Sequence, residues 1–350
     1  MKIGIIGAGG IAYKLHLPQL MQVPGVKVTH IAGREEWRLK FLCEKFDIPH
    51  YTLNYDDIVA DDSLDAVVVA TPHPQHVPFG LAVLNAGKHL LIQKPLCGKM
   101  EEADAFVDAV SKTNKTVLAL PHFGADSYKA RELVESGAIG KVTGAGCRVS
   151  HGGPEVYYAE VRDAFDEKSE YLWFFRASDA SVGALFDMGV YAVANLVSVL
   201  GSVQSVMGQV ATVDKPTTLE DTATLILHFA NGAVGCMETG WCDPARTFQM
   251  RVHGTKGKIV IPGDHGASMT LWEPTSYTRE DAPPKATPID AFESDRGSAH
   301  AHWVQCINEG RHPERSHAWA ARHVTEILLA GLESSRTGQR VTIRSRAERE

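Results

Sequence analysis

An apolar strand that runs directly into closely spaced glycines constrains the fold more than any other segment of this sequence. Residues 2–12 read KIGIIGAGGIA, which gives Gly7, Gly9 and Ala12 the spacing G-x-G-x-x-A. After a buried strand, the first glycine allows a tight turn, the second lets a pyrophosphate approach the backbone, and a small third residue lets the following helix pack closely. The N–H groups at the start of that helix favour phosphate. The segment predicts a dinucleotide site with contacts from Gly7, Gly9, Gly10, Ile11 and Ala12.

Residues 1–122 alternate short apolar runs with segments of helical spacing. Continuous apolar strands separated by helices indicate a parallel sheet that is covered on both faces. This pattern predicts a doubly wound α/β domain of the Rossmann type. The expected strands are Ile3–Ile6, Val26–Ala32, Ala66–Ala70, Leu90–Ile92 and Thr116–Leu120, and the expected helices are Glu35–Phe46, Pro74–Asn85 and Glu101–Asn114.

The pattern changes after a helix expected at Ser127–Ser136. Apolar and polar residues then alternate, with turn sequences between the runs, which predicts a large open sheet of mainly antiparallel strands. A chain of 350 residues exceeds the size of one core, so we expect two domains, 1–122 for the dinucleotide and 123–350 for the substrate and for oligomer contacts. Further expected elements are hairpin turns at Asn231-Gly232 and Gly254–Gly257, helices at Gly189–Leu200, His302–Asn308 and Ala318–Ser335, and an exposed loop over 273–297.

Composition excludes several classes of function. The formal net charge of -7 argues against general binding to nucleic acid or to anionic membranes. No apolar run is long enough to span a bilayer, and Met1-Lys2 leads into glycines rather than into a secretion signal. Six cysteines without a CxxC pair indicate reduced thiols, so we expect a cytoplasmic protein. The 16 histidines include no HExxH motif, and we expect no metal site.

The end of the second strand bears on the choice of coenzyme. A site for NAD usually has an acidic residue there to bind the ribose 2′-hydroxyl. This chain has Gly33 and Arg34 instead, and a guanidinium beside a small residue suits a 2′-phosphate. We therefore expect NADP, with NAD possible because Glu35 follows directly.

The end of the fourth strand, ATPHPQH, also falls at the carboxyl edge of the sheet, where open α/β sheets bind ligands. Thr71, Pro72, His73 and His76 are therefore expected contacts to the coenzyme. The alternative is that Thr71 and Pro72 only cap the helix and form the turn.

An ordered set of segments resembles the glucose–fructose oxidoreductase, inositol dehydrogenase and rhizopine catabolism (Gfo/Idh/MocA) family over essentially the whole chain. The segments are GAGGIA, ATPHPQH, GKHLLIQKPL, ELVESGAIGKV, GALFDMGVYAV, EDTATLILHFANGAVG and HGTKGKIVI. The resemblance implies a Rossmann domain followed by an α/β domain with a large open sheet. It implies hydride transfer between NAD(P) and a hydroxyl-bearing carbon of a sugar, polyol or cyclic diol. It also implies a homo-oligomer, a dimer or a tetramer.

The resemblance assigns the catalytic residues. The family's E-K-P motif corresponds to Gln93, Lys94 and Pro95, so Lys94 would reach the reacting hydroxyl and the nicotinamide ribose, with Gln93 beside the coenzyme in place of the family's acid. Asp187 and Tyr191 are four residues apart, a spacing that shares one face of a helix. Tyrosine has an unperturbed pKa of about 10, so Tyr191 needs a nearby cation, Lys94, to act as the acid or base near neutral pH. Asp187 would hold a substrate hydroxyl or Lys94.

The aromatic and polar segment ahead of Asp187 corresponds to the family's substrate region. Aromatic rings stack on the C–H face of a sugar, and polar side chains bind its hydroxyls. The alternative is that these aromatic residues pack the domain. The candidates are His151, Glu155, Tyr157, Tyr158, Trp173, Arg176 and Asp187.

Two other functions remain open. One is a hydrolase or lyase that retains NAD(P) and cleaves a glycosidic bond through transient oxidation, which turnover without added coenzyme would favour. The other is a non-catalytic sensor that binds NADP or a sugar. Gln93 favours a sensor, whereas the presence of Lys94, Asp187 and Tyr191 together counts against it.

Overall fold

The computed structural model divides into two compact units, and it describes residues 1–121, 125–164, 172–180, 182–263, 268–279, 281–290, 298–314 and 316–348. The first unit comprises Met1–His122, Tyr158–Ser181 and Asp295–Thr325, and the second comprises Phe123–Tyr157, Val182–Ser294 and Glu326–Glu350. The first unit thus takes in two segments from the part of the chain, 123–350, that the sequence assigns to the second domain.

The first unit is built on a six-stranded sheet with the order β3-β2-β1-β4-β5-β6, and every neighbouring pair is parallel. This order is that of the doubly wound dinucleotide fold, so the predicted fold class is confirmed. The sequence pattern missed β3, because its three residues are polar or exposed and carry no apolar run. The strands are β1 (Lys2–Ile6), β2 (Lys27–Ala32), β3 (His50–Thr52), β4 (Ala66–Val69), β5 (His89–Ile92) and β6 (Val117–Ala119).

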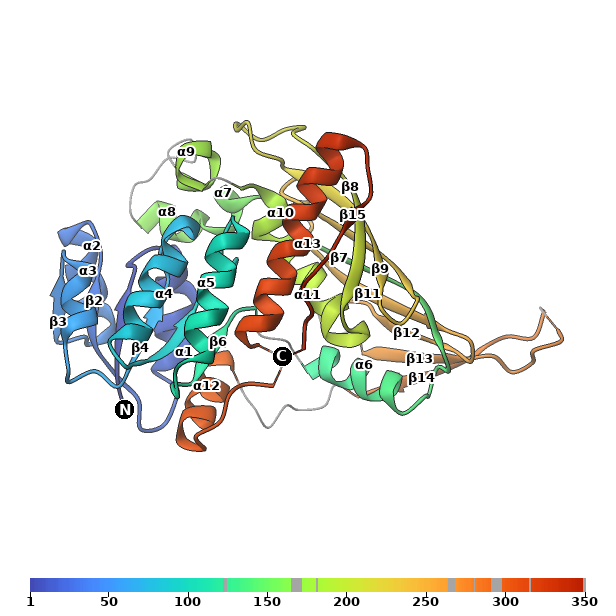
Figure 1. The fold of residues 1–350 in the computed structure, drawn as a ribbon, viewed down its shortest axis with the longest axis horizontal. Helices are drawn as coiled ribbons and strands as arrows, with labels where there is room; N and C mark the ends of the chain where they lie inside the picture. The colour runs from blue at the N-terminus through green and yellow to red at the C-terminus, as the bar shows by residue number, and fades with distance from the viewer. Residues whose placement is uncertain are drawn as a thin grey trace. The chain divides into compact units, whose positions relative to one another are not determined.

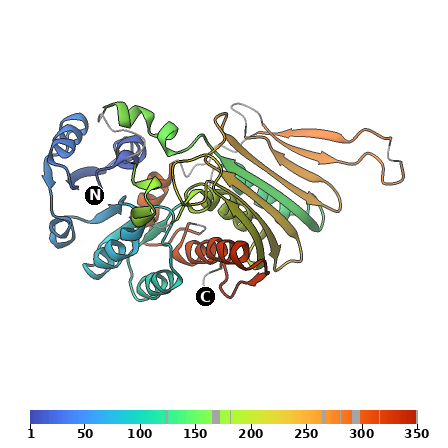
Figure 2. The same cartoon turned by 90° about the horizontal axis from the view of Figure 1, so that it is seen from above.

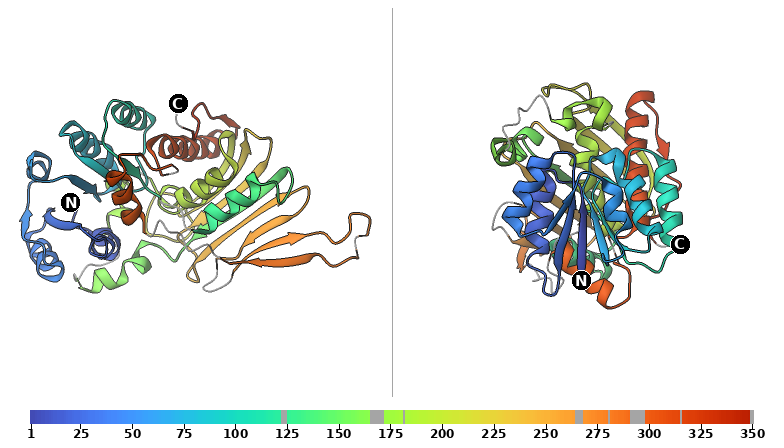
Figure 3. Two further views of the ribbon diagram at one scale, coloured as in Figure 1. Left: turned by 90° about the horizontal axis from the view of Figure 1, so that it is seen from below. Right: turned by 90° about the vertical axis from the view of Figure 1, so that its left-hand side faces the viewer.

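Helices lie on both faces of this sheet (Figures 1 and 3), and its side chains are buried in two apolar clusters. Side chains alternate along a strand, so Ile6 of β1 joins one apolar cluster while Ile3 and Ile5 join the other. This two-sided burial explains why the strands read as continuous apolar runs. The helices of this part are α1 (Leu17–Leu20), α2 (Glu36–Phe46), α3 (Tyr55–Ala60), α4 (His76–Asn85) and α5 (Met100–Ser111), with the short turns η1 (Ala12–His16) and η2 (His73–Gln75).

A helix from near the end of the chain, α12 (Ala299–Asn308), completes the first unit. The Ser298 hydroxyl accepts a hydrogen bond from the Ala301 N–H at 3.2 Å and so caps the start of α12. The Trp303 side chain has no exposed surface and belongs to the same apolar cluster as Ile3 and Ile5. The core of the N-terminal unit therefore depends on a residue some 300 positions along the chain.

The second unit contains a nine-stranded sheet in the order β14-β13-β12-β11-β7-β10-β9-β8-β15, whose strands lie side by side in Figure 2. Among the described strand pairs only β7 and β10 run parallel, which agrees with the predicted, mainly antiparallel sheet. The strands are β7 (Val142–Ser150), β8 (Val203–Ala211), β9 (Thr222–Phe229), β10 (Val234–Gly240), β11 (Thr247–Gly254), β12 (Lys258–Ile261), β13 (Met269–Glu273), β14 (Lys285–Ile289) and β15 (Val341–Thr342).

The structure confirms one predicted hairpin in detail and corrects one predicted loop. Gly232 has φ of 86° in the turn between β9 and β10, a conformation that favours glycine. The expected loop over 273–297 contains the strand β14, which pairs with β13. Pro288 hid this strand in the sequence, because a proline is tolerated only on an edge strand such as this one.

Helix α11 (Gly189–Leu200), whose bounds match the predicted helix, packs on β7 and β10 of the second sheet, and α6 (Ala125–Glu135) packs on α11 (Figure 3). In α11, which is described in full, Tyr191 alone is not buried. The remaining elements are α7 (Pro154–Tyr157), α8 (Ala159–Ala164), η4 (Trp173–Phe175), α9 (Ala177–Ala180), α10 (Ala184–Asp187) and α13 (Ala318–Thr337). Across the described ranges, no helix combines the length and apolar character needed to cross a bilayer.

We expect Trp303→Ala to lower the free energy of unfolding by about 3–5 kcal/mol, because it removes a large side chain from a closed core. Denaturant unfolding of the full chain measures this change. Trp37→Ala is the matched control, since Trp37 is 49% exposed, and we expect a change within about 0.5 kcal/mol. Equal effects of the two substitutions would contradict the assignment of α12 to the first core.

Candidate active site

The glycine-rich turn of the first unit has the shape that the fingerprint predicts. Gly7 has φ of +112°, and a Cβ there would lie 2.5 Å from the Ala70 carbonyl oxygen, so only glycine fits between β1 and β4. At Gly9 a Cβ would meet no described atom within 4 Å, which leaves open space beside the backbone. Ala12 is fully buried, as expected of the small residue that packs the helix against the strand.

Aromatic residues from the segment Tyr158–Ser181 pack on this same edge of the first unit. A Cβ on Gly10 would lie 2.6 Å from the Tyr158 ring. The Trp173 ring meets the His73 ring edge-on, with 4.7 Å between their centroids, and Phe174 stacks on Trp173 at 4.0 Å. Two residues expected to bind substrate, Tyr158 and Trp173, therefore contact two residues expected to bind the coenzyme.

The end of β4 carries a buried hydroxyl, that of Thr71. The Thr71 side chain is 5% exposed, and within the described part of the chain its Oγ1 is buried without a hydrogen bond. Buried hydroxyls are normally paired, so this oxygen marks a place for a ligand. Pro72 precedes the 3-10 turn η2 as its N-cap residue.

His76 lies between the ends of β4 and β5 and is fully buried. Its Nδ1 is 2.7 Å from the Pro95 carbonyl oxygen, and its Nε2 is 2.7 Å from the Thr71 carbonyl oxygen. Burial lowers the pKa of His76 to about 4, although both carbonyl contacts act in the opposite direction. Because both ring nitrogens face backbone oxygens, we expect His76 to position Thr71 and Pro95 rather than to touch a coenzyme.

Lys94 follows β5 at the same edge and is 9% exposed. Its backbone N–H donates to Gln93 Oε1 at 2.6 Å, so the Gln93 side chain folds back on the main chain. The Gln93 amide nitrogen is 3.2 Å from His16 Nε2. Gln93 thus has two protein partners, and neither was evident from the sequence.

The end of β2 presents arginines. Gly33 is buried, and a Cβ there would lie 2.7 Å from the Ala8 Cβ. Arg34 is exposed, whereas the Arg38 side chain is only 14% exposed and pairs with Glu35 at 3.0 Å. Burial lowers the pKa of Arg38, and the neighbouring Arg34 charge lowers it further. Arg38 is a basic residue at this strand end that the sequence reading missed, because it lies on the next turn of a helix.

These observations fit a bound dinucleotide. The open space at Gly9 accommodates a pyrophosphate against the backbone, and the unpaired Thr71 hydroxyl and the arginines after β2 offer polar contacts. All of these residues lie in the first unit.

In the second unit, Asp187 and Tyr191 lie on two consecutive helices. Asp187 is the last residue of α10, and Tyr191 lies in α11, which starts at Gly189. Met188, with φ of -110°, interrupts the regular geometry, so the prediction that the two residues share one continuous helix is wrong. Asn195 donates a hydrogen bond from Nδ2 to the Tyr191 carbonyl oxygen at 2.8 Å.

Asp187 is 5% exposed, and N–H-bearing side chains from two other segments of the chain lie beside its carboxyl group. Trp241 Nε1–H donates to Asp187 Oδ2 at 2.9 Å. His151 Nδ1 accepts the Gly153 N–H at 2.8 Å, so the proton of a neutral His151 ring lies on Nε2, which is 3.8 Å from Asp187 Oδ2. Tyr157 stacks on His151 with 5.7 Å between ring centroids. His151 and Asp187, predicted separately, therefore lie together, and Trp241 is a partner without any signal in the sequence.

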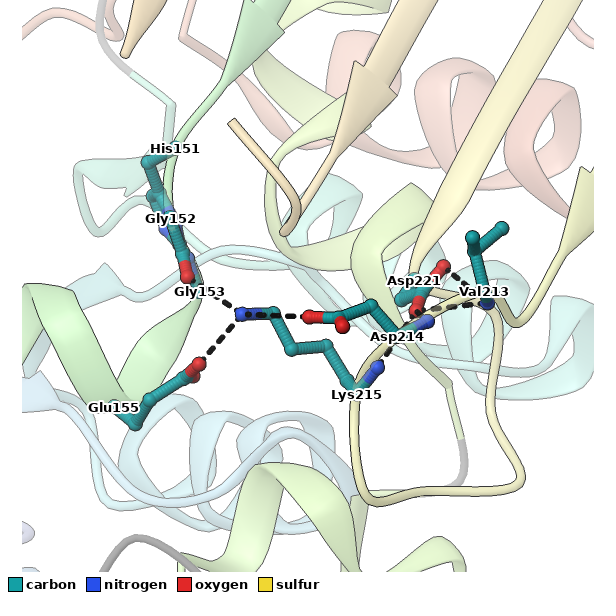
Figure 4. Close-up of polar contacts among 8 residues, drawn as sticks. All are labelled: His151, Gly152, Gly153, Glu155, Val213, Asp214, Lys215 and Asp221. Atoms are coloured by element: carbon teal, nitrogen blue, oxygen red, sulfur yellow. Dashed lines mark hydrogen bonds and ion pairs between the residues drawn. The ribbon is translucent and has the colours of Figure 1, made fainter. Parts of the chain in front are cut away.

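Glu155 is engaged by a lysine that the sequence analysis did not single out (Figure 4). Lys215 Nζ lies 2.6 Å from Glu155 Oε1 and donates to the Gly152 carbonyl oxygen at 2.8 Å. The loop that carries Lys215 is fixed by Asp221, whose carboxylate accepts the backbone N–H groups of Val213, Asp214 and Lys215. Arg176, the remaining substrate candidate, lies in the first unit and pairs with Asp179 at 2.6 Å.

The residues that the structure describes include no group of three or more histidine, cysteine, aspartate or glutamate side chains that would hold a metal ion.

The sheet order, the glycine turn and the polar strand ends define the class of protein, a dinucleotide-binding protein of the Rossmann type. A family model described as an oxidoreductase family with an NAD-binding Rossmann fold matches residues 1–120, and a model of the GFO/IDH/MocA C-terminal domain matches residues 128–260. The chain belongs to the Gfo/Idh/MocA family and is an NAD(P)-dependent oxidoreductase, which confirms the expected family.

Similar proteins align over nearly the whole chain. D-xylose 1-dehydrogenase (NADP(+)) 2 of Haloferax volcanii is 26% identical over 98% of this chain and 100% of its own length. Trans-1,2-dihydrobenzene-1,2-diol dehydrogenase of Mus musculus is 26% identical over 96% of this chain and 90% of its own. Aldose-aldose oxidoreductase from Caulobacter crescentus, complexed with glycerol, has a similar structure, with a TM-score of 0.80 at 22% identity over 98% of this chain and 99% of that one. The last similarity shows the shared fold.

Gly7 and Gly9 should respond differently to alanine, because one site is closed by protein and the other is open. We expect Gly9→Ala to leave the unfolding midpoint unchanged but to weaken coenzyme binding at least tenfold, measured by titration calorimetry. We expect Gly7→Ala to destabilise the protein, since its Cβ would collide with the Ala70 carbonyl. Unchanged coenzyme affinity in Gly9→Ala would contradict the assignment of the open space to the pyrophosphate.

Proposed function

We propose that this protein transfers a hydride between NAD(P) and a secondary hydroxyl or ketone of a sugar, polyol or cyclic diol. Family membership supports an oxidoreductase, and two relatives that align along nearly their full length are named for D-xylose and for a dihydrobenzene diol. Both names specify a ring or chain carbon that bears a hydroxyl beside another hydroxyl. This shared chemistry defines the proposed substrate class.

One observation carries the proposal. Tyr191 is the one residue of α11 whose side chain is not buried. Asp187, two residues ahead of that helix, has a buried carboxyl group that accepts a hydrogen bond from Trp241 and lies near His151. A phenol needed only for packing would be buried with its neighbours. A half-buried phenol beside a fixed carboxylate is suited to exchange a proton with a ligand.

In the proposed mechanism Tyr191 takes the proton of the substrate hydroxyl during oxidation and returns it during reduction. The unperturbed pKa of tyrosine is about 10, so its ionised form needs a cation, and we assign this role to the ammonium of Lys94. Asp187, oriented by Trp241, holds a second substrate hydroxyl or Lys94. A bound nicotinamide coenzyme would supply the hydride acceptor for oxidation of the hydroxyl-bearing carbon, or the hydride donor for the reverse reaction.

The coenzyme is proposed to be NADP. Arg34 and Arg38 bring two guanidinium groups to the end of β2, and Arg38 is largely buried there. Two like charges at a partly buried site favour an anion between them, and a 2′-phosphate is such an anion. Glu35, the residue that could serve an NAD ribose, is paired with Arg38. Gly9, Gly10, Thr71, Pro72 and His73 are the proposed contacts along the rest of the coenzyme.

We expect Tyr191→Phe to lower kcat by about 10²–10⁴-fold with little change in coenzyme affinity, because it removes only the proton donor and acceptor. A screen of sugars, inositols and cyclic diols, followed by coenzyme absorbance, first identifies a substrate and then measures the variant, with Lys94→Ala beside it. Tyr277→Phe is the matched control, since Tyr277 is 75% exposed and should leave kcat unchanged. Wild-type kcat in both Tyr191→Phe and Lys94→Ala would exclude the proposed roles.

We expect Arg34→Ala to raise the Kd for NADPH by about tenfold to a hundredfold, the loss typical of a hydrogen bond to a charged group, and to change the Kd for NADH little. Fluorescence titration with NADPH and with NADH measures the two Kd values and hence their ratio. Lys40→Ala, which removes an exposed cation of the same region, serves as the control. An equal loss of affinity for both coenzymes would argue against a 2′-phosphate contact.

A further inference from the structure

A buried chain of hydrogen bonds leads from the backbone of Lys94 into the core of the first unit. The Lys94 N–H donates to Gln93 Oε1 at 2.6 Å, and the Gln93 amide nitrogen lies 3.2 Å from His16 Nε2. His16 Nδ1 lies 2.8 Å from His300 Nε2, and His300 Nδ1 lies 2.7 Å from Gln19 Oε1. His16 and His300 have no exposed surface, and Gln93 is 5% exposed.

The chemistry of these groups determines which atom donates and which accepts in each hydrogen bond of the series. A backbone N–H can only donate, so Gln93 Oε1 accepts and the Gln93 amide nitrogen must donate. His16 Nε2 is then an acceptor, and the ring proton of His16 lies on Nδ1, where it is donated to His300 Nε2. By the same reasoning His300 carries its proton on Nδ1 and donates it to Gln19. Both histidines are therefore neutral Nδ1–H tautomers.

Local structure explains how the two histidines reach Gln93. His16 ends the π-helical turn η1, and Pro18, which lacks an N–H, follows in the first turn of α1. A π-helical turn is uncommon and is frequent at functional sites. His300 lies in the first turn of α12, the helix that Trp303 anchors in the core. Neither position belongs to a motif that the proposed mechanism uses.

The surroundings keep His16 uncharged. Burial is the main cause that lowers the pKa of His16 well below its ordinary value, and the charges of His300 and His76 lower it further. A protonated His16 would also lose its acceptor for the Gln93 amide. For His16, burial and geometry thus agree on the neutral form, and the contacts of His300 follow from it.

We propose that His16, His300 and Gln19 are positioning residues that hold the Gln93 amide in one orientation and thereby fix the backbone from which Lys94 extends. The inference rests on the proposed function for the role of Lys94. The direction of the hydrogen bonds from Lys94 to Gln19 is independent of that function. A glutamate at position 93 would accept from the Lys94 N–H but would offer no N–H to His16. The Nδ1–H histidines therefore match glutamine, and Gln93 is a component of this network.

The tautomers provide a direct test that needs no substrate. Histidine-selective ¹⁵N labelling and long-range ¹H–¹⁵N correlation of the wild-type protein near neutral pH report which ring nitrogen is protonated. We expect His16 and His300 to show the Nδ1–H pattern, which is the minor form of free histidine. Their signals are assigned by their loss in His16→Gln and His300→Gln. An Nε2–H or doubly protonated form at either residue would overturn the proposal.

A second measurement separates positioning from mere packing. His16→Gln can accept from Gln93 and donate to His300, whereas His16→Leu has similar bulk and does neither. We expect kcat to fall at least tenfold in His16→Leu and to be largely restored in His16→Gln, with the two variants equally stable in thermal unfolding. Equal kcat in both variants would contradict a positioning role.

Gln93→Glu completes the test. We expect it to move the His16 proton to Nε2 or to add a second proton, visible in the same spectra, because the carboxylate can only accept. Unchanged His16 signals in Gln93→Glu would contradict the proposed direction of the chain. If the spectra agree with the network while Lys94→Ala keeps wild-type kcat, then the proposed function fails and the network stands. If the spectra disagree while Lys94→Ala is inactive, the network fails and the proposed function stands.

Discussion

The close approach of β1 and β4 at Gly7 is the constraint on which the nucleotide edge of the first unit depends. The Gly7 N–H donates to the Ala32 carbonyl oxygen of β2 at 2.9 Å, while the missing Cβ would collide with the Ala70 carbonyl oxygen after β4. Three neighbouring strands therefore end around one residue that has no side chain. This arrangement places Thr71 beside Gly7, and the turn continues to Gly9, where the space beside the backbone is open, so a single steric requirement fixes the edge of the sheet where the site lies.

Local sequence was sufficient to predict the elements and the edge of the sheet, because those depend on near neighbours in the chain. The two-sided burial of the parallel strands produced apolar runs, and the glycine spacing identified the turn. The weak points were also local: β3 is short and polar, β14 contains a proline, and Met188 interrupts the stretch from Asp187 to Tyr191. At β3 and β14, pairing with a neighbouring strand overrides what the segment itself indicates.

The contacts that orient the candidate side chains could not be predicted, because they join residues that are far apart in the chain. His16 meets His300 across 284 positions, and Trp241 meets Asp187 across 54. Neither pair leaves a spacing or a motif in one sequence. The positions of Tyr158 and Trp173 at the edge of the first unit could not be predicted for the same reason. Their contacts with Gly10 and His73 join residues that are far apart in the chain.

The polar residues beside Lys94 and those around Asp187 are both held by directed hydrogen bonds. Beside Lys94 the partners are the Gln93 amide and, through it, the buried imidazoles of His16 and His300, in a directed series of hydrogen bonds. At Asp187 a buried carboxyl group accepts the indole N–H of Trp241, and His151 Nε2 lies at longer range, 3.8 Å from the same oxygen. An indole N–H can only donate, so Trp241 orients the Asp187 carboxyl oxygen without exchanging a proton with it. In both groups, fixed hydrogen-bond partners determine the position of the side chain or backbone that the proposed mechanism uses.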